Sequence, residues 1–169
     1  MMLLKKFNRN FKLSVFDAVL TSVAIAFMPF PKILNDNGEK IFTIILGILF
    51  WVGILGTVIF SLEANSKRKL IEKRYKKKGL KLHTEKQLGL ISFFKNKEAT
   101  CCDAVMLISL AVTVLLLCLD KGPNWLVFIL ISVTFLSFCM HCCLNGKNYL
   151  YIKSIKQYFE SKKERQKNG

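Results

Sequence analysis

The stretch that decides the fold is residues 41–62, which read IFTIILGILFWVGILGTVIFSL and contain no charged residue. A helix rises about 1.5 Å per residue, so a run of this length matches the hydrocarbon layer of a bilayer, about 30 Å thick. Because lipid offers no hydrogen-bond partner to backbone N–H and C=O groups, such a run must be helical. Residues 41–62 are therefore predicted to form a transmembrane helix.

Three other runs share this apolar character and cover residues 13–34, 101–119 and 125–144. The chain of 169 residues is 52% hydrophobic and yet carries a net charge of +15. A small soluble domain does not contain four separate apolar segments of this length. The prediction is an all-α integral membrane protein with four transmembrane helices.

The 26 Lys and Arg residues gather before the first run, between the second and third, and after the fourth. Lys and Arg are enriched on the cytoplasmic side of bilayers. Both termini and the central segment are therefore predicted to be cytoplasmic, and the two short links to face outward from the plasma membrane. Four crossings return the chain to its starting side, so the number of helices agrees with the charge.

The first apolar run also has a feature of a cleaved signal peptide, because Ala24-Ile25-Ala26 follows a basic start. Asp17 interrupts that run, and apolar residues continue past the small residues to Phe30. These two observations favour a retained transmembrane helix over cleavage.

The two halves of the chain resemble each other in order. The segment from Phe16 to Leu20 aligns with that from Cys102 to Met106, and Asn65-Ser66-Lys67 aligns with Asn145-Gly146-Lys147. We therefore predict two tandem hairpins, a parallel internal repeat about an axis along the membrane normal.

The repeat divides the chain into a first unit, residues 1–82, and a second unit, residues 83–169. Each unit is expected to open with an amphipathic helix lying in the membrane interface and to close with a basic cytoplasmic segment, which in the second unit is the tail. For residues 1–11, a frayed basic terminus that only sets topology is the alternative.

The central basic segment is expected to continue the second helix into the cytoplasm and to end near Gly79. Basic clusters beside a bilayer attract anionic lipid headgroups at about 1 kcal/mol per residue. Nucleic acid is the other usual partner of a basic run, but the adjacent bilayer favours lipid. The candidate lipid contacts are Lys67, Arg68, Lys69, Lys76, Lys77 and Lys78.

Two acidic residues, Asp17 and Asp103, occupy equivalent places near the cytoplasmic ends of the first and third apolar runs. A carboxylate inside a membrane is costly, so this pair is a candidate ion or proton site. The competing interpretation is structural, because an acid in the first turns of a helix interacts favourably with the helix dipole.

Five of the six cysteines fall near the cytoplasmic end of the second hairpin, with His141 among them. Cys102, Cys139, Cys142 and Cys143 are weak candidates for a metal site, since spacings of three and four share a helix face. A redox pair at Cys139 and Cys142 would lie at a helix C-terminus, where the dipole disfavours thiolate. S-acylation and ordinary packing in a reducing compartment are the other interpretations.

Gly53, Gly56 and Thr57 share one face of the second helix, where small residues allow another helix to approach. This face is a candidate for packing between the hairpins or between subunits. Ordinary tolerance of glycine in a membrane helix is the alternative.

The chain has no phosphate-binding glycine loop, no Ser/His/Asp set and no zinc-protease motif. We therefore expect no enzyme and no cofactor. The leading hypothesis is a multi-pass accessory, assembly or protective factor that acts through helix packing and basic cytoplasmic surfaces, with a protein partner or a homo-oligomer. The alternative is a small transporter or channel subunit that uses Asp17 and Asp103.

Overall fold

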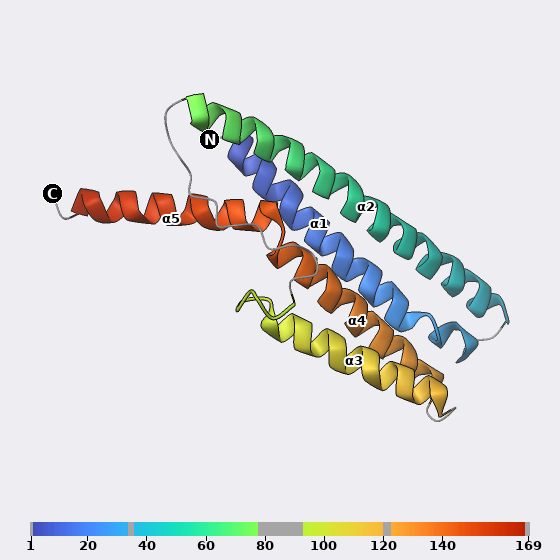
Figure 1. Cartoon of the computed structure of the whole chain (residues 1–169). Coiled ribbons are helices and arrows are strands. Elements are labelled where there is room, and N and C mark those ends of the chain that lie inside the picture. The colour runs from blue at the N-terminus through green and yellow to red at the C-terminus, as the bar shows by residue number, and fades with distance from the viewer. Residues whose placement is uncertain (1, 34–35, 78–92, 120–122, 168–169) are drawn as a thin grey trace.

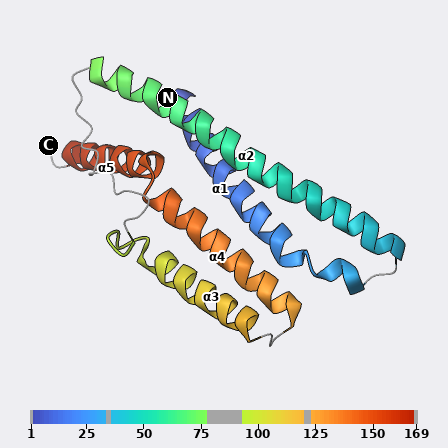
Figure 2. The same ribbon diagram turned by 45° about the vertical axis from the view of Figure 1, so that its right-hand side comes forward.

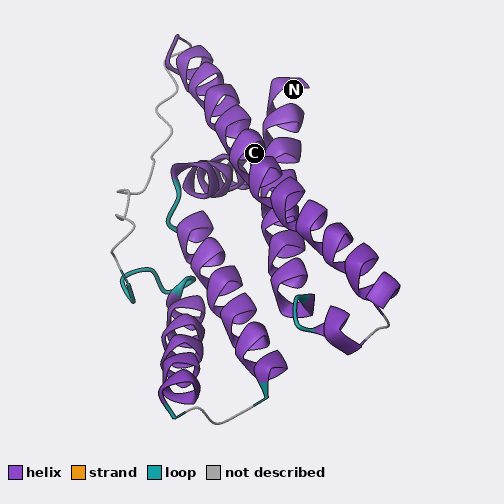
Figure 3. Cartoon of the chain, turned by 90° about the vertical axis from the view of Figure 1, so that its right-hand side faces the viewer, coloured by secondary structure: helices purple, strands orange, loops and turns teal. Residues whose placement is uncertain are grey.

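The computed structural model describes residues 2–33, 36–77, 93–119 and 123–167, and all regular structure within them is helical (Figure 3). The elements are α1 (Met2–Phe27), the short 3-10 helix η1 (Phe30–Ile33), α2 (Asp36–Lys77), α3 (Thr100–Cys118), α4 (Asn124–Leu144) and α5 (Lys147–Lys167). Helices α1 to α4 are long and apolar enough to cross a membrane. The prediction of an all-helical multi-pass membrane protein is confirmed at this level.

The four apolar helices lie side by side in the order α2, α1, α4, α3 (Figures 1 and 2). Helix α1 packs along α2 on one side and along α4 on the other, while α3 packs along α4. Within the described residues α3 does not pack along α2. The two hairpins therefore meet at a joint between α1 and α4. The internal repeat stays a prediction from the sequence.

Polar residues lie between the helices and apolar ones face outward. Buried positions of α1, α3 and α4 include Thr21, Ser22, Ser109, Thr113 and Ser132. In a water-soluble protein this pattern would be reversed, with apolar side chains between the helices and polar ones outside. Lipid, however, solvates apolar side chains as well as a protein core does. At the joint, the hydroxyls of Ser22 and Ser132 lie 2.8 Å apart, and each also donates to the other's backbone carbonyl.

Helix α2 has 42 residues, about 63 Å at 1.5 Å per residue, and so exceeds the hydrocarbon layer roughly twofold. It continues without a break from the apolar run through the central basic segment to Lys77, close to the predicted end. At one end of the membrane spans, α1 starts, α2 and α4 end, and α5 begins. We call this end the basic end.

Residues 2–11, for which a separate interfacial helix is expected from the sequence, form the first turns of α1 itself. Part of the apolar side of this segment packs against other helices. Phe7 is fully buried and packs edge-on against Tyr151 of α5, with ring centroids 5.9 Å apart. Burial against two other helices is worth more to Phe7 than partial insertion at an interface. The equivalent leader of the second unit falls largely in residues 78–92, outside the described residues.

Helix α5 leaves the direction of α4 at Asn145-Gly146 and runs away from the four spans (Figure 1). Gly146 has a structural reason to be glycine, since a Cβ there would lie 2.9 Å from the carbonyl oxygen of Cys142. The start of α5 packs against the extensions of α1 and α2 around a small core made of Phe7, Ala64, Ile71, Tyr151 and Ile155. We call this assembly of helix ends the platform.

Candidate functional site

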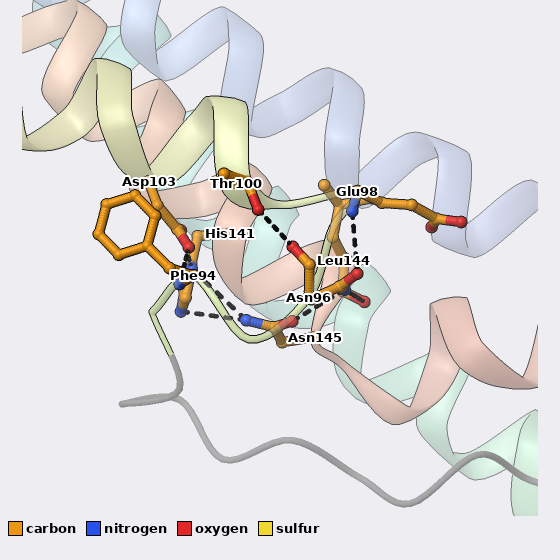
Figure 4. Close-up of polar contacts among 8 residues, drawn as sticks. All are labelled: Phe94, Asn96, Glu98, Thr100, Asp103, His141, Leu144 and Asn145. Atoms are coloured by element: carbon orange, nitrogen blue, oxygen red, sulfur yellow. Dashed lines mark hydrogen bonds and ion pairs between the residues drawn. The ribbon is translucent and has the colours of Figure 1, made fainter.

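A buried polar network joins α3, α4 and the segment before α3 at the basic end (Figure 4). At its centre, Asp103 Oδ1 pairs with His141 Nδ1, and both side chains are 0% exposed. Asp103 lies in the first turn of α3 and His141 in the last turn of α4. The antiparallel packing of these two helices places those turns side by side.

The hydrogen bonds of this network assign the orientation of its two side-chain amides. The backbone N–H of Glu98 donates to Asn96 Oδ1 at 3.1 Å, so Asn96 Nδ2 must be the donor to Asn145 Oδ1 at 3.0 Å. The Nδ2 group of Asn145 then faces the imidazole of His141, 3.2 Å from Nε2 and 3.4 Å from Nδ1.

The network also holds the backbone before α3 in an unusual conformation. Phe94 has φ 58°, in the left-handed region that costs a residue with a Cβ about 1–2 kcal/mol. Its N–H donates to Asp103 Oδ2 at 2.7 Å, and the neighbouring Phe93 ring stacks on His141 with centroids 4.6 Å apart. The Asp103 carboxylate thus binds both α4 and this segment.

A carboxylate that orients an imidazole occurs in many catalytic sites, where the second ring nitrogen faces the substrate. Here the Asn145 amide lies within 3.4 Å of both ring nitrogens, and the ring is fully buried. The geometry supports a structural role that ties the first turn of α3 to the last turn of α4.

A second polar contact fastens the same segment to α5. Glu98 Oε1 pairs with Lys153 Nζ at 2.9 Å, and Tyr149 donates its hydroxyl to Glu98 Oε2 at 3.0 Å. Both hydrogen bonds favour the carboxylate and hold the pKa of Glu98 below its usual value. Burial and the bond to Glu98 raise the pKa of the Tyr149 hydroxyl.

The two carboxylates of the proposed ion site do not share a site. Asp17 belongs to the α1–α2 pair, is 9% exposed and faces Gly56. Its Oδ2 atom is buried and meets no hydrogen-bond donor in the part of the chain that the structure describes. Asp103 has its partners in α4 and in the segment before α3. Asp17 is therefore the one of the two with a buried carboxylate oxygen that lacks a donor among the described residues.

The small face of α2 packs within its own hairpin. A Cβ on Gly53 would lie 2.9 Å from the Asp17 carbonyl oxygen, and one on Gly56 would meet the Asp17 carboxylate. The Thr57 hydroxyl bonds back to the Gly53 carbonyl at 2.8 Å. This face brings α1 close to α2, whereas the joint between hairpins uses Ser22 and Ser132.

All six cysteines are free thiols. Cys139, Cys142 and Cys143 line one side of a cavity of about 430 Å³ between α1, α2 and α4. Cys101 is exposed and Cys102 is half-buried. Within residues 2–33, 36–77, 93–119 and 123–167, no three His, Cys, Asp or Glu side chains are arranged to hold a metal ion.

The candidate lipid contacts divide into two kinds. Lys69 and Lys76 are exposed and Lys67 is half-buried, whereas Arg68 is only 7% exposed. Arg68 donates to Asn148 of α5 at 3.1 Å and to Asn65 at 2.6 Å, and it pairs with Glu72 at 2.5 Å. It joins α2 to α5 and is not available to a headgroup. The Lys77 side chain and Lys78 lie outside the described residues.

Sequence reasoning did not find the Asp103–His141 pair, because it grouped Asp103 with Asp17 and His141 with the cysteines. A signal was available, since the first turn of one helix and the last turn of the next meet in any antiparallel hairpin. An acid and a histidine in those two turns of one hairpin are therefore a candidate pair. Asn96 and Asn145 gave no such signal.

The chain matches no protein-family model, no curated protein and no solved structure.

Proposed function

We propose that this protein is a non-enzymatic accessory or assembly factor of the cell membrane, whose platform holds basic helices in a fixed position for a partner. The observation that carries the proposal is the packed core of the platform. Basic segments that only orient the chain in the membrane do not have to pack around a core. Here, however, Phe7, Ile71 and Tyr151 are almost completely buried against one another. The distribution of Lys and Arg supports a cytoplasmic position for the platform.

Polar contacts around this core support a fixed geometry. Arg68 connects α2 to α5 through Asn148, and Asn10 of α1 donates to Glu63 of α2 at 2.6 Å. Glu98 connects the segment before α3 to α5 through Lys153. All of these elements therefore contribute to one assembly, and α5 is held at its first two turns.

The length of α2 decides which partner its exposed lysines suit. Lys76 lies 14 residues beyond the apolar run, about 21 Å along the helix. Headgroups extend about 5–7 Å beyond the hydrocarbon, and charges are screened within about 8 Å at physiological salt. Lys67 and Lys69 are thus placed for anionic headgroups. Lys73 and Lys76 are exposed and lie beyond them, so they suit the acidic surface of a protein partner.

The proposal is tested by a photo-crosslinking residue at Leu70, an exposed position between Lys69 and Lys73. We expect a discrete protein adduct in cells. Lys73→Glu with Lys76→Glu should abolish this adduct by charge reversal, while the matched control Lys5→Glu with Lys6→Glu, on exposed lysines of α1, should retain it. The absence of any protein adduct, or an adduct that both double variants retain, would contradict the proposal.

A second candidate function, a cation- or proton-dependent transporter subunit, is favoured by the buried Oδ2 atom of Asp17, which meets no hydrogen-bond donor among the described residues. A carboxylate oxygen left open inside a membrane helix is a candidate site for a mobile cation or proton. We expect Asp17→Asn to abolish such a flux in proteoliposomes and Asp103→Asn to impair folding instead. A protein that conducts no flux, and that keeps its cellular role with Asp17→Asn, excludes this function.

A further inference from the structure

The cavity of about 430 Å³ is a groove over α1. Its floor is formed by α1 from Phe11 to Ala18, and its walls are formed by α2 and α4. The turn between α4 and α5 closes it at the basic end. Its volume lies within the range of ligand pockets, roughly 300–1,000 Å³.

The lining of the groove changes with depth in the membrane. Val15 and Ala18 of α1, Thr57 of α2 and Leu136 of α4 line its deep part, since they lie furthest along their helices from the basic end, and the hydroxyl of Thr57 bonds back to its own helix. Asn65, Lys147 and Asn148 line its part at the basic end. An apolar part inside the hydrocarbon and a polar part at the interface match the two parts of a phospholipid.

The groove also opens towards the bilayer. Leu62 on the α2 wall is 62% exposed and Phe138 on the α4 wall is 47% exposed, so both rims face lipid. A lipid in the surrounding bilayer is therefore able to enter from the side, with no path through water.

The polar part offers donors rather than acceptors. Arg68 occupies the carbonyl oxygens of Asn65 and Asn148, which leaves the N–H donors as the remaining polar groups of both amides. Lys147 adds an exposed ammonium, and no acidic residue is among the described residues that line the groove. These donors complement a phosphate and not a cation.

The lining changes with depth, and its polar part offers N–H donors and an ammonium. From these two observations we propose that the groove binds one anionic phospholipid, with an acyl chain along α1 and the phosphate at Asn65, Asn148 and Lys147. The site is separate from Lys73 and Lys76 and does not depend on the protein partner proposed for them.

Native mass spectrometry of the detergent-purified protein tests the proposal. We expect one phosphatidylglycerol per chain, bound at least fivefold more tightly than phosphatidylcholine. Lys147→Gln should weaken phosphatidylglycerol binding about fivefold, while Lys97→Gln, an exposed lysine outside the groove, should leave it unchanged. Leu136→Trp, which fills the deep part, should reduce the binding of both lipids, whereas Ile131→Trp on the exposed face of α4 should not.

Two results would overturn the proposal. One is equal binding of the two lipids with no effect of Lys147→Gln. The other is binding of inorganic phosphate alone as tightly as phosphatidylglycerol, which would make the site a free-anion site. Failure of the photo-crosslink at Leu70 would leave these measurements unaffected, so the two proposals fail separately.

Thiol labelling gives a test without any change to the polar part of the lining. A variant that retains only Cys142, which lines the groove, should react several-fold more slowly with a membrane-permeant maleimide in phosphatidylglycerol vesicles than in phosphatidylcholine vesicles. A variant that retains only Cys118, which is exposed at the opposite end of α3, should react equally in both. Equal rates for Cys142 in the two vesicles would contradict occupancy of the groove by the anionic lipid.

Discussion

At the scale of single residues, the most consequential pair is Asp103 and His141, which are buried together at the basic end. Removing one partner of a buried pair leaves the other without compensation, and such losses cost about 3–5 kcal/mol. Replacing both with apolar residues removes the desolvated charge as well. The pair is therefore expected to show strong energetic coupling, which a double-mutant cycle measures.

We expect His141→Leu to lower the free energy of unfolding by about 3–5 kcal/mol, because Asp103 stays buried and keeps, among the described residues, the Phe94 N–H as its donor. Asp103→Leu with His141→Leu should cost less than His141→Leu alone. Unfolding in mixed detergent micelles, followed by circular dichroism, gives both values. If the two single costs simply add in the double variant, the pair does not act as a unit.

The close approach of α1 to α2 depends on Gly56. A Cβ at that position would meet the Asp17 carboxylate, with its Cγ at 2.7 Å, so Gly56→Ala should cost about 1–3 kcal/mol of unfolding free energy. Gly47 is the matched control, because a Cβ there meets nothing within 4 Å, and Gly47→Ala should be neutral or slightly stabilising. In an Asp17→Ala background the cost of Gly56→Ala should disappear. A cost that persists in that background would place its cause elsewhere than in this contact.

At the scale of elements, the molecule is joined by a few polar contacts between helices rather than by a continuous apolar core. Ser22 and Ser132 join α1 to α4, the Asp103 network joins α3 to α4, and Arg68 joins α2 to α5. Hydrogen bonds between membrane helices contribute on average about 0.6 kcal/mol each. The arrangement of the helices therefore depends on several modest contacts, each at one interface.

The link from the segment before α3 to α5 should depend on pH. Lys153 and Tyr149 hold the pKa of Glu98 below its usual value near 4.5, so the carboxylate is charged and the link is complete above that pH. As pH falls through the lowered pKa, the carboxyl takes up a proton and the link is lost. Spin labels at Lys97 and Gln157 should report one distance from neutral pH to about 4.5 and a broader distribution below it. Glu98→Gln should show the broader distribution at neutral pH, and a pH response that survives in this variant would rule out Glu98 as its source.

At the scale of the whole molecule, four apolar helices form an open row in which α2 and α3 are the outer members (Figure 2). The outward side chains of these two helices are largely apolar, as lipid requires. The polar helix extensions gather at one end and form the platform, so the two halves of the chain meet both at the α1–α4 joint and beside α5.

This arrangement places both termini on one side, and the charge distribution predicts that this side is the cytoplasm. We expect a cysteine at Asn124, at the exposed start of α4, to react in intact cells with a membrane-impermeant maleimide. A cysteine at Ser161 of α5 should react only after the cells are permeabilised. The native cysteines are replaced in both variants, and the opposite labelling pattern would invert the proposed orientation.

The sequence by itself determined the number of long apolar helices, the limits of α3 and α4 to within one residue, the continuation of α2 into the basic segment and the gathering of charge at one end, whereas α1 starts well before and ends well before the predicted run 13–34. It did so because the thickness of the bilayer and the cost of burying charge act on each segment separately, so each segment carries its own signal. The packed state of residues 2–11, the pairing of Asp103 with His141 and the groove over α1 were decided only by the tertiary structure. In a membrane, an apolar helix face is about equally stable against lipid and against another helix. The spacing of apolar residues therefore does not predict which helices are neighbours. Only the observed order of α2, α1, α4 and α3 shows which polar side chains meet and where the groove lies.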